Sequence, residues 1–510
     1  MTAAKPEHDA KEIELKLAFA PADAPRILSH PVILASQAAP TTRELISVYY
    51  DTGEDVLRKA GVFLRVRSTG DGYVQTIKTA RGEAEFLERD EWEQPTPTHE
   101  PDLGAADGTA LAPLLNADVR AALGPRFQTR FRRQTYWMRC DDTEIELAID
   151  QGEITAGVLA TPISELELEL KAGDKRELFH LARDLAESVP LFLAIKTKAE
   201  RGFELCDGGD FSVEKAGDIV ITPDMTCGDA FRAIARSCLR QIVANTPAVR
   251  GGRPEALHQM RIGLRRLRAG LSLFADVVAD QDREHIKSEL RWITQELGPA
   301  RDLDVYAADV LEPLRATHPG APEIAEAHRD FLDRHAAAYA RATSAVGSDR
   351  FRKLLLDLAA WIEIGAWADH GTTLDAAPVD GPATRHAAKH LSKLRRTIKK
   401  KGRRLREASA PERHKLRIRA KRLRYATEFF AATFPGKKSD KRREKSLAAL
   451  KELQDSLGIL SDIATRALLA AGEGVPPREP GADSAEEATQ LKRAVCAYER
   501  FADAKAFWKA

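Results

Sequence analysis

Residues 12–17 read EIELKL, and their side chains alternate strictly between charged and aliphatic. In a β-strand successive side chains point to opposite faces, so Glu12, Glu14 and Lys16 share one face. A strand with one side in water shows the same pattern. The alternative is that the charged face is turned inward, toward a ligand.

Several later stretches also place charges on one face of an expected strand. These charged positions are Arg65 and Arg67, Lys78, Glu91 and Glu93, Arg130, Arg132 and Arg133, and Glu165, Glu167 and Glu169. If all these faces were solvated, an open sheet would be charged over one whole side. A closed barrel with a polar interior explains the pattern better.

The two kinds of charge predict complementary chemistry. Clustered carboxylates bind hard divalent cations such as Mg²⁺ through oxygen ligands. Clustered arginines and lysines bind phosphate oxygens. Both kinds in one cavity predict metal-assisted attack of water on a polyphosphate.

The composition is that of an ordinary soluble protein, with 510 residues, 43% hydrophobic and 30% charged. At roughly 150 residues per domain, about three units are expected. The five cysteines are odd in number and lack CxxC spacing, which fits a reducing cytoplasm. The N-terminus has no apolar signal core and no run of about 18 apolar residues occurs, so neither an export signal nor a membrane span is expected.

The net charge of +1 conceals two halves of opposite sign. Residues 1–210 hold 25 Lys+Arg against 37 Asp+Glu, a net of −12, and residues 211–510 hold 53 against 40, a net of +13. The first half has short alternating runs separated by Gly, Pro and Asp, with one amphipathic helix near 175–188. Residues 207–226 read as a linker, and nearly everything beyond has helical period. Two domains with different partners are therefore expected.

Eight motifs of the first half resemble CYTH domains, the triphosphate tunnel metalloenzymes. In order they are EIELK, YYDT, LRVR, TIK, EWE, an Asp150-Gln-Gly turn, ELELEL and KTKAERGF. The resemblance covers about residues 10–206. It implies an eight-stranded antiparallel β-tunnel with flanking helices, and hydrolysis of a triphosphate with Mg²⁺ or Mn²⁺.

The resemblance also implies roles for individual residues. The expected metal-binding carboxylates are Glu12, Glu14, Glu165 and Glu167, with Glu169 competing as a third glutamate of its strand. The expected phosphate-binding residues are Lys16, Arg65, Arg67, Lys78, Arg133, Lys198 and Arg201. Asp150 matches an acidic position before the last strand. Lys196 competes with Lys198, and Arg130 and Arg132 are expected at the surface.

The helical half contains an internal repeat. Residues 258–268 read HQMRIGLRRLR and residues 414–424 read HKLRIRAKRLR, and each copy is followed by an LGxxxD element. The matched positions are His258 with His414, Arg261 with Arg417, Arg265 with Lys421, and Arg268 with Arg424. These positions share one helix face, where like charges would repel each other. A duplicated helical bundle that binds a polyanion is the prediction.

Residues 385–424 lie between the copies and extend over the second one. They hold 18 Lys+Arg against two glutamates, a net of +16, and contain no Phe, Tyr or Trp. A solvated basic face is one interpretation and an anion-binding site is the other. Readout of RNA or DNA favours aromatic platforms, so a bare phosphate chain is the favoured anion.

The paired motifs resemble the CHAD domain, a conserved histidine α-helical domain, over about residues 222–510. The resemblance implies two pseudo-symmetric bundles, about 222–380 and 381–510, around a basic channel that binds inorganic polyphosphate. The matching positions are His258, Arg261, Arg265, Arg266, Arg268, Arg301, His414, Arg417, Lys421, Arg422 and Arg424. The sequence shows no nucleophile or metal cluster in this half, so binding rather than catalysis is expected there.

The sequence therefore predicts an α+β multidomain chain with a CYTH domain at 1–206, a linker at 207–221 and a CHAD domain at 222–510. The expected function is metal-dependent hydrolysis of inorganic triphosphate or short polyphosphate, joined to polyphosphate binding. Adenylate cyclase or thiamine triphosphatase chemistry in the same tunnel stays open, as does a non-catalytic polyphosphate- or nucleic-acid-binding granule protein. The expected location is the cytoplasm, with polyphosphate granules as a further partner, and neither a membrane nor nucleic acid is expected to bind.

Overall fold

The computed structural model describes residues 7–8, 13–36, 38–70, 72–79, 91–209, 212–319, 321–368, 379–473 and 482–509. They form two compact units. The first unit comprises Met1–Gly217, Arg236–Leu264 and Gln281–Ala366, and the second comprises Asp218–Ala235, Arg265–Asp280 and Trp367–Ala510. The first unit contains helical residues as well as the sheet, so this division does not test the domain boundary expected near residue 206. That boundary stays a prediction.

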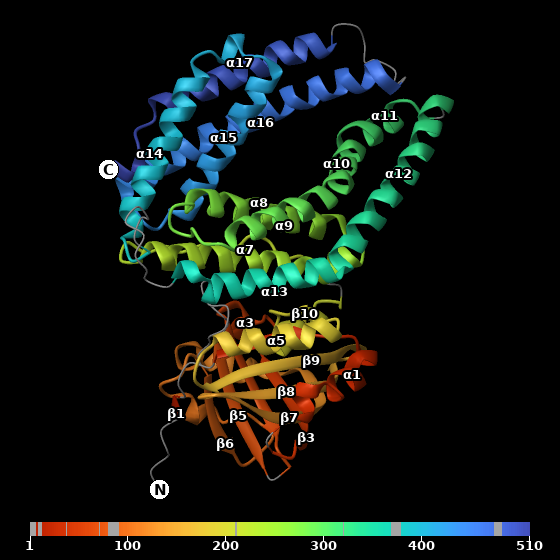
Figure 1. Cartoon of the computed structure of the whole chain (residues 1–510), viewed down its shortest axis with the longest axis vertical. Coiled ribbons are helices and arrows are strands. Elements are labelled where there is room, and N and C mark those ends of the chain that lie inside the picture. The colour runs from red at the N-terminus through yellow and green to blue at the C-terminus, as the bar shows by residue number, and fades with distance from the viewer. Residues whose placement is uncertain are drawn as a thin grey trace. The chain divides into compact units, whose positions relative to one another are not determined.

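The first unit contains one antiparallel sheet in the order β1-β6-β5-β4-β3-β7-β8-β9-β2-β10 (Figure 1). The strands are β1 (Glu7–His8), β2 (Ile13–Ala18), β3 (Thr41–Asp51), β4 (Val62–Ser68), β5 (Tyr73–Thr79), β6 (Glu91–Thr96), β7 (Gly124–Cys140), β8 (Thr143–Ala156), β9 (Leu159–Ala172) and β10 (Phe192–Leu193). Eight of them have six or more residues, and the two edge strands have two each. The expected eight-stranded antiparallel architecture is confirmed, with two short strands added at its edges.

The turn expected at Asp150 is wrong, because this residue lies within the continuous strand β8. Residues 150–152 pair with β7 on one side and with β9 on the other. Gly152 allows the close approach of β7, since a Cβ atom there would come within 2.1 Å of the Arg130 carbonyl oxygen. Asp150 therefore projects from the middle of the sheet.

Short helices cover the outer face of β3, β4 and β5. The helices that cover this face are α3 (Val56–Lys59) and α4 (Ala117–Ala122). Two further short helices of the unit are α1 (Ala24–Leu28) and α2 (Pro31–Leu34). Leu57 of α3 and Val119 of α4 join a buried cluster with Leu64 and Ile77 of the strands. The amphipathic helix α5 (Arg176–Ser188) contacts β9, which confirms the helix expected at 175–188.

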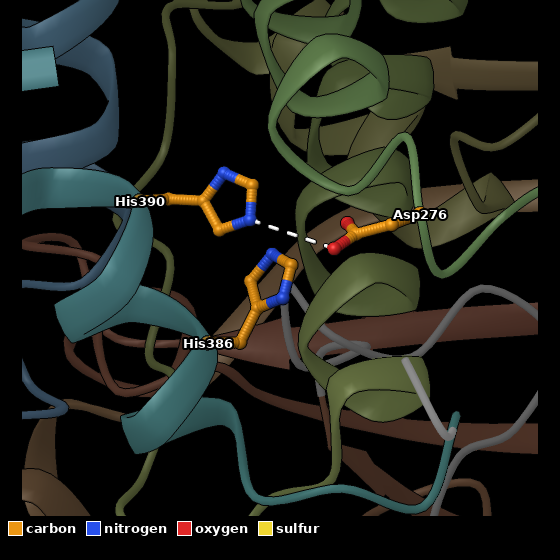
Figure 2. Close-up of side chains that lie close together, drawn as sticks. All are labelled: Asp276, His386 and His390. Atoms are coloured by element: carbon orange, nitrogen blue, oxygen red, sulfur yellow. Dashed lines mark ion pairs between the residues drawn. The ribbon is translucent and has the colours of Figure 1, made fainter. Parts of the chain in front are cut away.

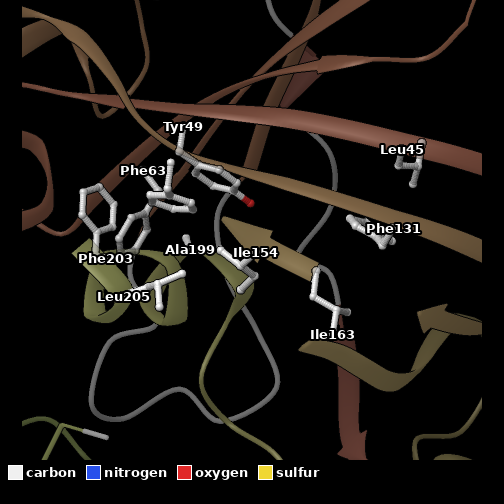
Figure 3. Packing of buried hydrophobic residues seen from close by; sticks show 10 residues of the cluster. Leu45, Tyr49, Phe63, Phe131, Ile154, Ile163, Ala199, Phe203 and Leu205 are labelled. Atoms are coloured by element: carbon white, nitrogen blue, oxygen red, sulfur yellow. The ribbon is translucent and has the colours of Figure 1, made fainter. Parts of the chain in front are cut away.

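Helix α6 (Lys198–Cys206) packs against the opposite, inner face of the sheet. Figure 3 shows Phe203 and Leu205 of this helix beside Tyr49 and Phe63 of the strands. Gly202 lies against the ring of Phe127, where a Cβ atom would meet ring carbon at 2.0 Å. This close packing fixes the helix and places its first turn against the charged residues of the inner face.

Helices dominate the chain after residue 226, as expected. They are α7 (Cys227–Arg250), α8 (Pro254–Leu273), α9 (Arg283–Glu296), α10 (Gly298–Tyr306), α11 (Glu312–Thr317), α12 (Pro322–Gly347), α13 (Asp349–Ile364), α14 (Ala383–Gly402), α15 (Ala410–Phe429), α16 (Lys437–Glu473) and α17 (Ala482–Asp503). The two motif copies lie on α8 and α15, each of 20 residues. Within the described part of the chain, no helix combines the length and apolarity needed to cross a membrane.

Candidate functional site

The charged face of β2 is as buried as its aliphatic face. Glu14 and Lys16 are 3% and 4% exposed, and Leu15 and Leu17 are each 1% exposed. A solvated edge would leave the charged side chains in water. The strand is therefore covered on both sides, and its charged side chains lie on a buried face of the sheet.

Lys198 lies at the centre of a buried group of carboxylates on that face. Its Nζ is 2.8 Å from Asp150 Oδ2, 2.8 Å from Glu165 Oε2 and 2.8 Å from Glu167 Oε1. Asp150 of β8 stands directly opposite Glu165 of β9, so the two side chains point to the same face. Thr197 caps α6 with its side chain, which fixes Lys198 as the first helical residue.

Arg133 of β7 joins Asp150 to Glu167. Its Nε and Nη2 donate to the two oxygens of Asp150 at 2.7 Å each, and Nη2 also donates to Glu167. Such a bidentate pair holds both groups in a defined plane. Asp150 has no exposed surface, so Arg133 and Lys198 together compensate its charge.

Two more cations complete this part of the site. Lys16 Nζ lies 2.7 Å from Glu167 Oε1 and 3.6 Å from Glu14 Oε1. Arg201, one turn along α6 from Lys198, donates to Glu165. The sequence placed these charges on separate motifs, and the structure brings them into one network.

The network determines the ionisation state of its glutamates and of Lys198. Burial alone would raise the pKa of Glu165 and of Glu167, but Lys198 and Lys16 outweigh it and hold both pKa values below their ordinary range. Burial would lower the pKa of Lys198, but the surrounding carboxylates raise it above its usual value. Both glutamates are thus anions at neutral pH, suited to holding a cation rather than to carrying a proton.

Strands β4 to β6 place a second set of charges on the same face. Lys78 Nζ lies 2.5 Å from Glu91 Oε2, and Arg65 Nη2 lies 3.7 Å from Glu91 Oε1 and 3.5 Å from Glu93 Oε1. Burial raises the pKa of Glu93, but Arg65 and its neighbours lower it below the ordinary value. Glu91 and Glu93 therefore pair with the expected phosphate-binding residues.

Two cations, Arg65 and Arg133, act on Arg67 more strongly than the nearby carboxylate of Glu93 does. Burial, with the positive charges of Arg65 and Arg133, lowers the pKa of Arg67 to about 9. Its Nε donates to Ser47 Oγ at 3.2 Å. Three guanidinium groups gathered on one buried face favour the arrival of an anion, because an anion removes their mutual repulsion.

Glu12 and Glu169 are the two other expected metal ligands. Glu12 lies outside the described residues. Glu169 stands opposite Glu14 in the register, and its Oε1 lies 2.5 Å from the Lys171 ammonium at the more open end of the strand.

Lys196 and Lys198, at the start of α6, have different partners in the structure. Lys196 Nζ lies 2.6 Å from Glu204 Oε1, so its charge is matched within its own segment. Arg130 and Arg132 are exposed, as expected.

Two contributors were absent from the sequence-based prediction. Ser47 is fully buried opposite Arg67 and orients it, and Thr76 donates to Glu93 Oε1 at 2.9 Å. The period of two along ISVYY and YVQTIKT places both residues on the charged face, so this signal was available. Arg240 of α7 was also missed; it binds Glu200 at 2.6 Å and Glu214 at 3.1 Å. Nothing in the local sequence links these partners.

The duplicated motif carries a repeated structural contact in the helical part. In the first unit, Arg261 lies against Gly298, with its Nη1 3.7 Å from where a Cβ atom would stand. In the second unit, Arg417 lies against Gly458, with its Nη2 3.1 Å from that position. Each arginine therefore lies beside the glycine of the corresponding LGxxxD element, most closely at Gly458, and this repeated placement supports the internal duplication.

The other expected polyphosphate-binding residues differ in exposure. Arg266 is 6% exposed and lies over the Phe429 ring, whereas Arg268, His414 and Arg422 are exposed. Arg424 pairs with Glu428 at 3.4 Å. The half-buried members are His258, Arg261, Arg265, Arg301, Arg417, Lys421 and Arg424. His258, Arg261 and Arg301 belong to the first unit and the rest to the second, so one shared groove stays a prediction.

Part of the basic run at 385–424 has a structural role. Arg395 donates to the carbonyl oxygens of Phe501 and Ala502 at 3.1 Å each, and Lys399 donates to Ala502 at 2.9 Å. Cations favour the C-terminal end of a helix, here α17. These two residues are therefore engaged in packing, and fewer charges of the run face a ligand than its net charge suggests.

The structure thus combines a buried face of interleaved carboxylates and cations with a duplicated basic helical region. Residues 10–203 match the CYTH domain and residues 233–471 match the CHAD domain. The chain is a fusion of a CYTH domain with a CHAD domain.

Individual relatives were found for each part. The chain is 33% identical over 204 residues to a Haemophilus influenzae protein named "Inorganic triphosphatase", a match over 38% of this chain and 55% of that protein. The chain thus spans about half the length of this relative. An uncharacterized protein of Mycobacterium tuberculosis is 26% identical over 75% of both chains. The CHAD domain from the plant Ricinus communis is 28% identical, covering 56% of this chain and 96% of its own, with a TM-score of 0.46.

Proposed function

We propose that the inner face of the sheet hydrolyses inorganic triphosphate or short polyphosphate with the help of a divalent cation. The observation that carries this proposal is the buried network in which Asp150, Glu165 and Glu167 surround Lys198, on the same face as Arg65 and Arg67. The name of the Haemophilus influenzae relative, which aligns with this part of the chain, supports the same substrate class.

The donor set fits a hard cation. Glu14, Glu165 and Glu167 offer only oxygen atoms from adjacent strands β2 and β9, and oxygen ligands are what Mg²⁺ and Mn²⁺ prefer. Glu12 and Glu169 stay proposed as further ligands. When bound, the cation would neutralise phosphate charge and polarise the reacting phosphoryl group.

The residues of the chain have separate tasks in this proposal. Arg65, Arg67 and Lys78 bind the phosphate oxygens, and anion binding relieves the repulsion that lowers the pKa of Arg67. Arg133 binds phosphate while it holds Asp150 in place. Lys198 and Arg201 keep the carboxylates charged and fixed in position.

The helical part, in the same proposal, binds inorganic polyphosphate. The support is the repeated placement of arginine beside glycine, together with buried guanidinium atoms. Among the described residues, Nε of Arg265 and Nε of Arg417 are buried without a hydrogen-bond acceptor. A polyanion would supply acceptors and charge. Association with polyphosphate granules in the cytoplasm, and a boundary between the two domains at 207–221, belong to this proposal.

A substrate panel tests the proposal. Phosphate release is measured from tripolyphosphate, ATP, thiamine triphosphate and long-chain polyphosphate, with and without Mg²⁺. We expect Mg²⁺-dependent release that is fastest from tripolyphosphate. Cyclic AMP formation from ATP would indicate cyclase chemistry, and preference for thiamine triphosphate would indicate that alternative. Absence of release from every substrate would refute the catalytic proposal and leave a binding protein.

A further inference from the structure

Three side chains that the proposed function does not use meet in the second unit. Asp276 follows the end of α8, and His386 and His390 lie one turn apart on α14. Figure 2 shows the three side chains turned toward one another, and one ligand atom from each lies within 4.8 Å of the other two. Asp276 lies 110 residues before His386 in the sequence, so no short motif reveals the group.

The polar atoms of this group are incompletely satisfied. His390 Nε2 lies 3.7 Å from Asp276 Oδ2, which is too long for a hydrogen bond. In the described part of the chain, His390 Nε2 and Asp276 Oδ1 are buried and have no hydrogen-bond partner. Buried polar groups are normally paired, and such exceptions often mark an ion or water that belongs there.

Packing holds the two imidazole rings in place. His386 is 5% exposed, its ring stacks on Phe274 at 4.5 Å, and the two histidine rings are 4.2 Å apart. Its Nε2 lies 3.1 Å from the carbonyl oxygen of Leu273. Leu273 is the last residue of α8, and the C-terminal end of a helix favours a cation.

We propose that Asp276, His386 and His390 bind a divalent transition-metal cation of the zinc class. Two imidazoles and one carboxylate form a mixed nitrogen and oxygen donor set, which suits Zn²⁺ better than Mg²⁺. Histidines at i and i+4 on a helix present their rings to one ion, as in other zinc sites on helices. The fourth position takes water, because the Leu273 carbonyl oxygen already accepts from His386 Nε2.

The required rearrangement is small. Ligand atoms about 2.0–2.2 Å from a tetrahedral zinc ion are roughly 3.3–3.6 Å from one another, so atoms now within 4.8 Å must close by about 1 Å. Lys389 competes for the carboxylate, since its Nζ is 3.8 Å from Asp276 Oδ2. Its side chain is 70% exposed and can turn into solvent when the cation binds.

The bound cation would fasten the start of α14 to the end of α8. Both segments belong to the second unit and are joined here through side chains rather than backbone pairing. The site is separate from the carboxylates of the sheet, whose donors are all oxygen. Its role is therefore structural stabilisation of the helical part, independent of the proposed hydrolysis.

The test is zinc binding by the full chain after chelation. Equilibrium dialysis and calorimetric titration are done with Mg²⁺ in large excess, so that the oxygen-only carboxylates are occupied. The variants are Asp276→Asn and His390→Gln, and the matched control is His285→Gln, which removes an exposed histidine outside the group. We expect one zinc ion bound by the wild type and by the control, and at least about a tenfold loss of affinity in both variants, since even supporting groups of metal sites contribute about 10–100-fold.

Equal zinc affinity in the wild type and both variants would overturn the proposal. If a variant fails to fold, X-ray absorption of the zinc-loaded wild type decides instead. Two imidazole ligands in that spectrum support the site, whereas an oxygen-only environment overturns it.

Discussion

Replacing Lys198 with methionine removes the cation at the centre of the buried carboxylates while keeping a side chain of similar length. Asp150, Glu165 and Glu167 would each lose a partner that now lies at 2.8 Å. Lys198 is 8% exposed, so water cannot readily replace its charge. The variant therefore tests whether this network is as strongly coupled as its geometry indicates.

Removing one partner of a buried ion pair destabilises a protein by about 3–5 kcal/mol. For a domain the length of the stretch 10–203, each kcal/mol lowers the melting temperature by about 2–4 °C, which gives a decrease of about 6–20 °C. A divalent cation that binds the carboxylates released from Lys198 should recover part of this loss. At a concentration about 100-fold above its Kd, the recovery is about 2.7 kcal/mol.

The assay is differential scanning calorimetry of the full chain with and without Mg²⁺, and Lys196→Met is the matched control. Lys196 lies two residues earlier and pairs with a single carboxylate, Glu204, so its loss should cost less than the loss of Lys198. Mg²⁺ should stabilise Lys198→Met more than it stabilises the wild type. Equal melting temperatures for the two variants would refute the reasoning.

The pH dependence of stability follows from the direction of the pKa shifts of Glu165 and Glu167. The folded-state pKa values of Glu165 and Glu167 are depressed, so their stabilising contribution is present above the unfolded pKa of about 4.3 and is lost as pH falls toward the folded values. The stability difference between wild type and Lys198→Met should therefore shrink below about pH 4. A difference that stays constant down to about pH 2.5 would contradict the shifted pKa values.

Three further predictions follow from other parts of the molecule. Arg67→Gln should leave the melting temperature unchanged or raised, because it relieves repulsion with Arg65 and Arg133. In steady-state kinetics, KM for tripolyphosphate should rise by about tenfold or more. A destabilised variant with normal KM would contradict this prediction. Arg240→Met should destabilise the first unit by about 1–2 kcal/mol and lower kcat, because Glu200, two residues after Lys198 in α6, loses its cation. Calorimetry measures the first effect and steady-state kinetics the second. No change in either would exclude this coupling. The combined replacement Arg261→Ala, Arg265→Ala, Arg417→Ala and Lys421→Ala should weaken binding of long-chain polyphosphate by about tenfold or more and reduce its salt dependence. The control for this last prediction replaces the exposed Lys437, Lys438, Lys492 and Lys505, and equal damage in titrations of both sets at two salt concentrations would rule out a dedicated binding surface.

Much of the sheet could be predicted because local patterns determined it. Strict alternation on β2 and β9 gave both the strands and the face on which Glu14, Lys16, Glu165 and Glu167 lie. The prediction failed at Asp150, where Gln151 and Gly152 resemble a turn locally. Pairing with two neighbouring strands overrides that preference, and glycine serves close strand packing instead.

Other features depend on residues that are distant in the sequence. Arg240 meets Glu200 and Glu214 only after folding, and Asp276 meets two histidines more than a hundred residues away. The sequence alone revealed no metal-binding group in the helical half, because these three side chains come together only in the folded chain. For the basic run at 385–424, the composition overstated the number of charges available to a ligand. Arg395 and Lys399 instead bind carbonyl oxygens at the end of α17.

The most direct test of the central claim is Mg²⁺-dependent phosphate release from tripolyphosphate by the wild type and by Glu14→Gln. Glu14 is 3% exposed on the inner face, and glutamine keeps its shape while removing the charge that would hold the cation. A loss of charge stabilisation at the transition state predicts a decrease of at least about tenfold in kcat. Wild-type rates in a folded Glu14→Gln variant would contradict the proposal that this face of the sheet is the active site.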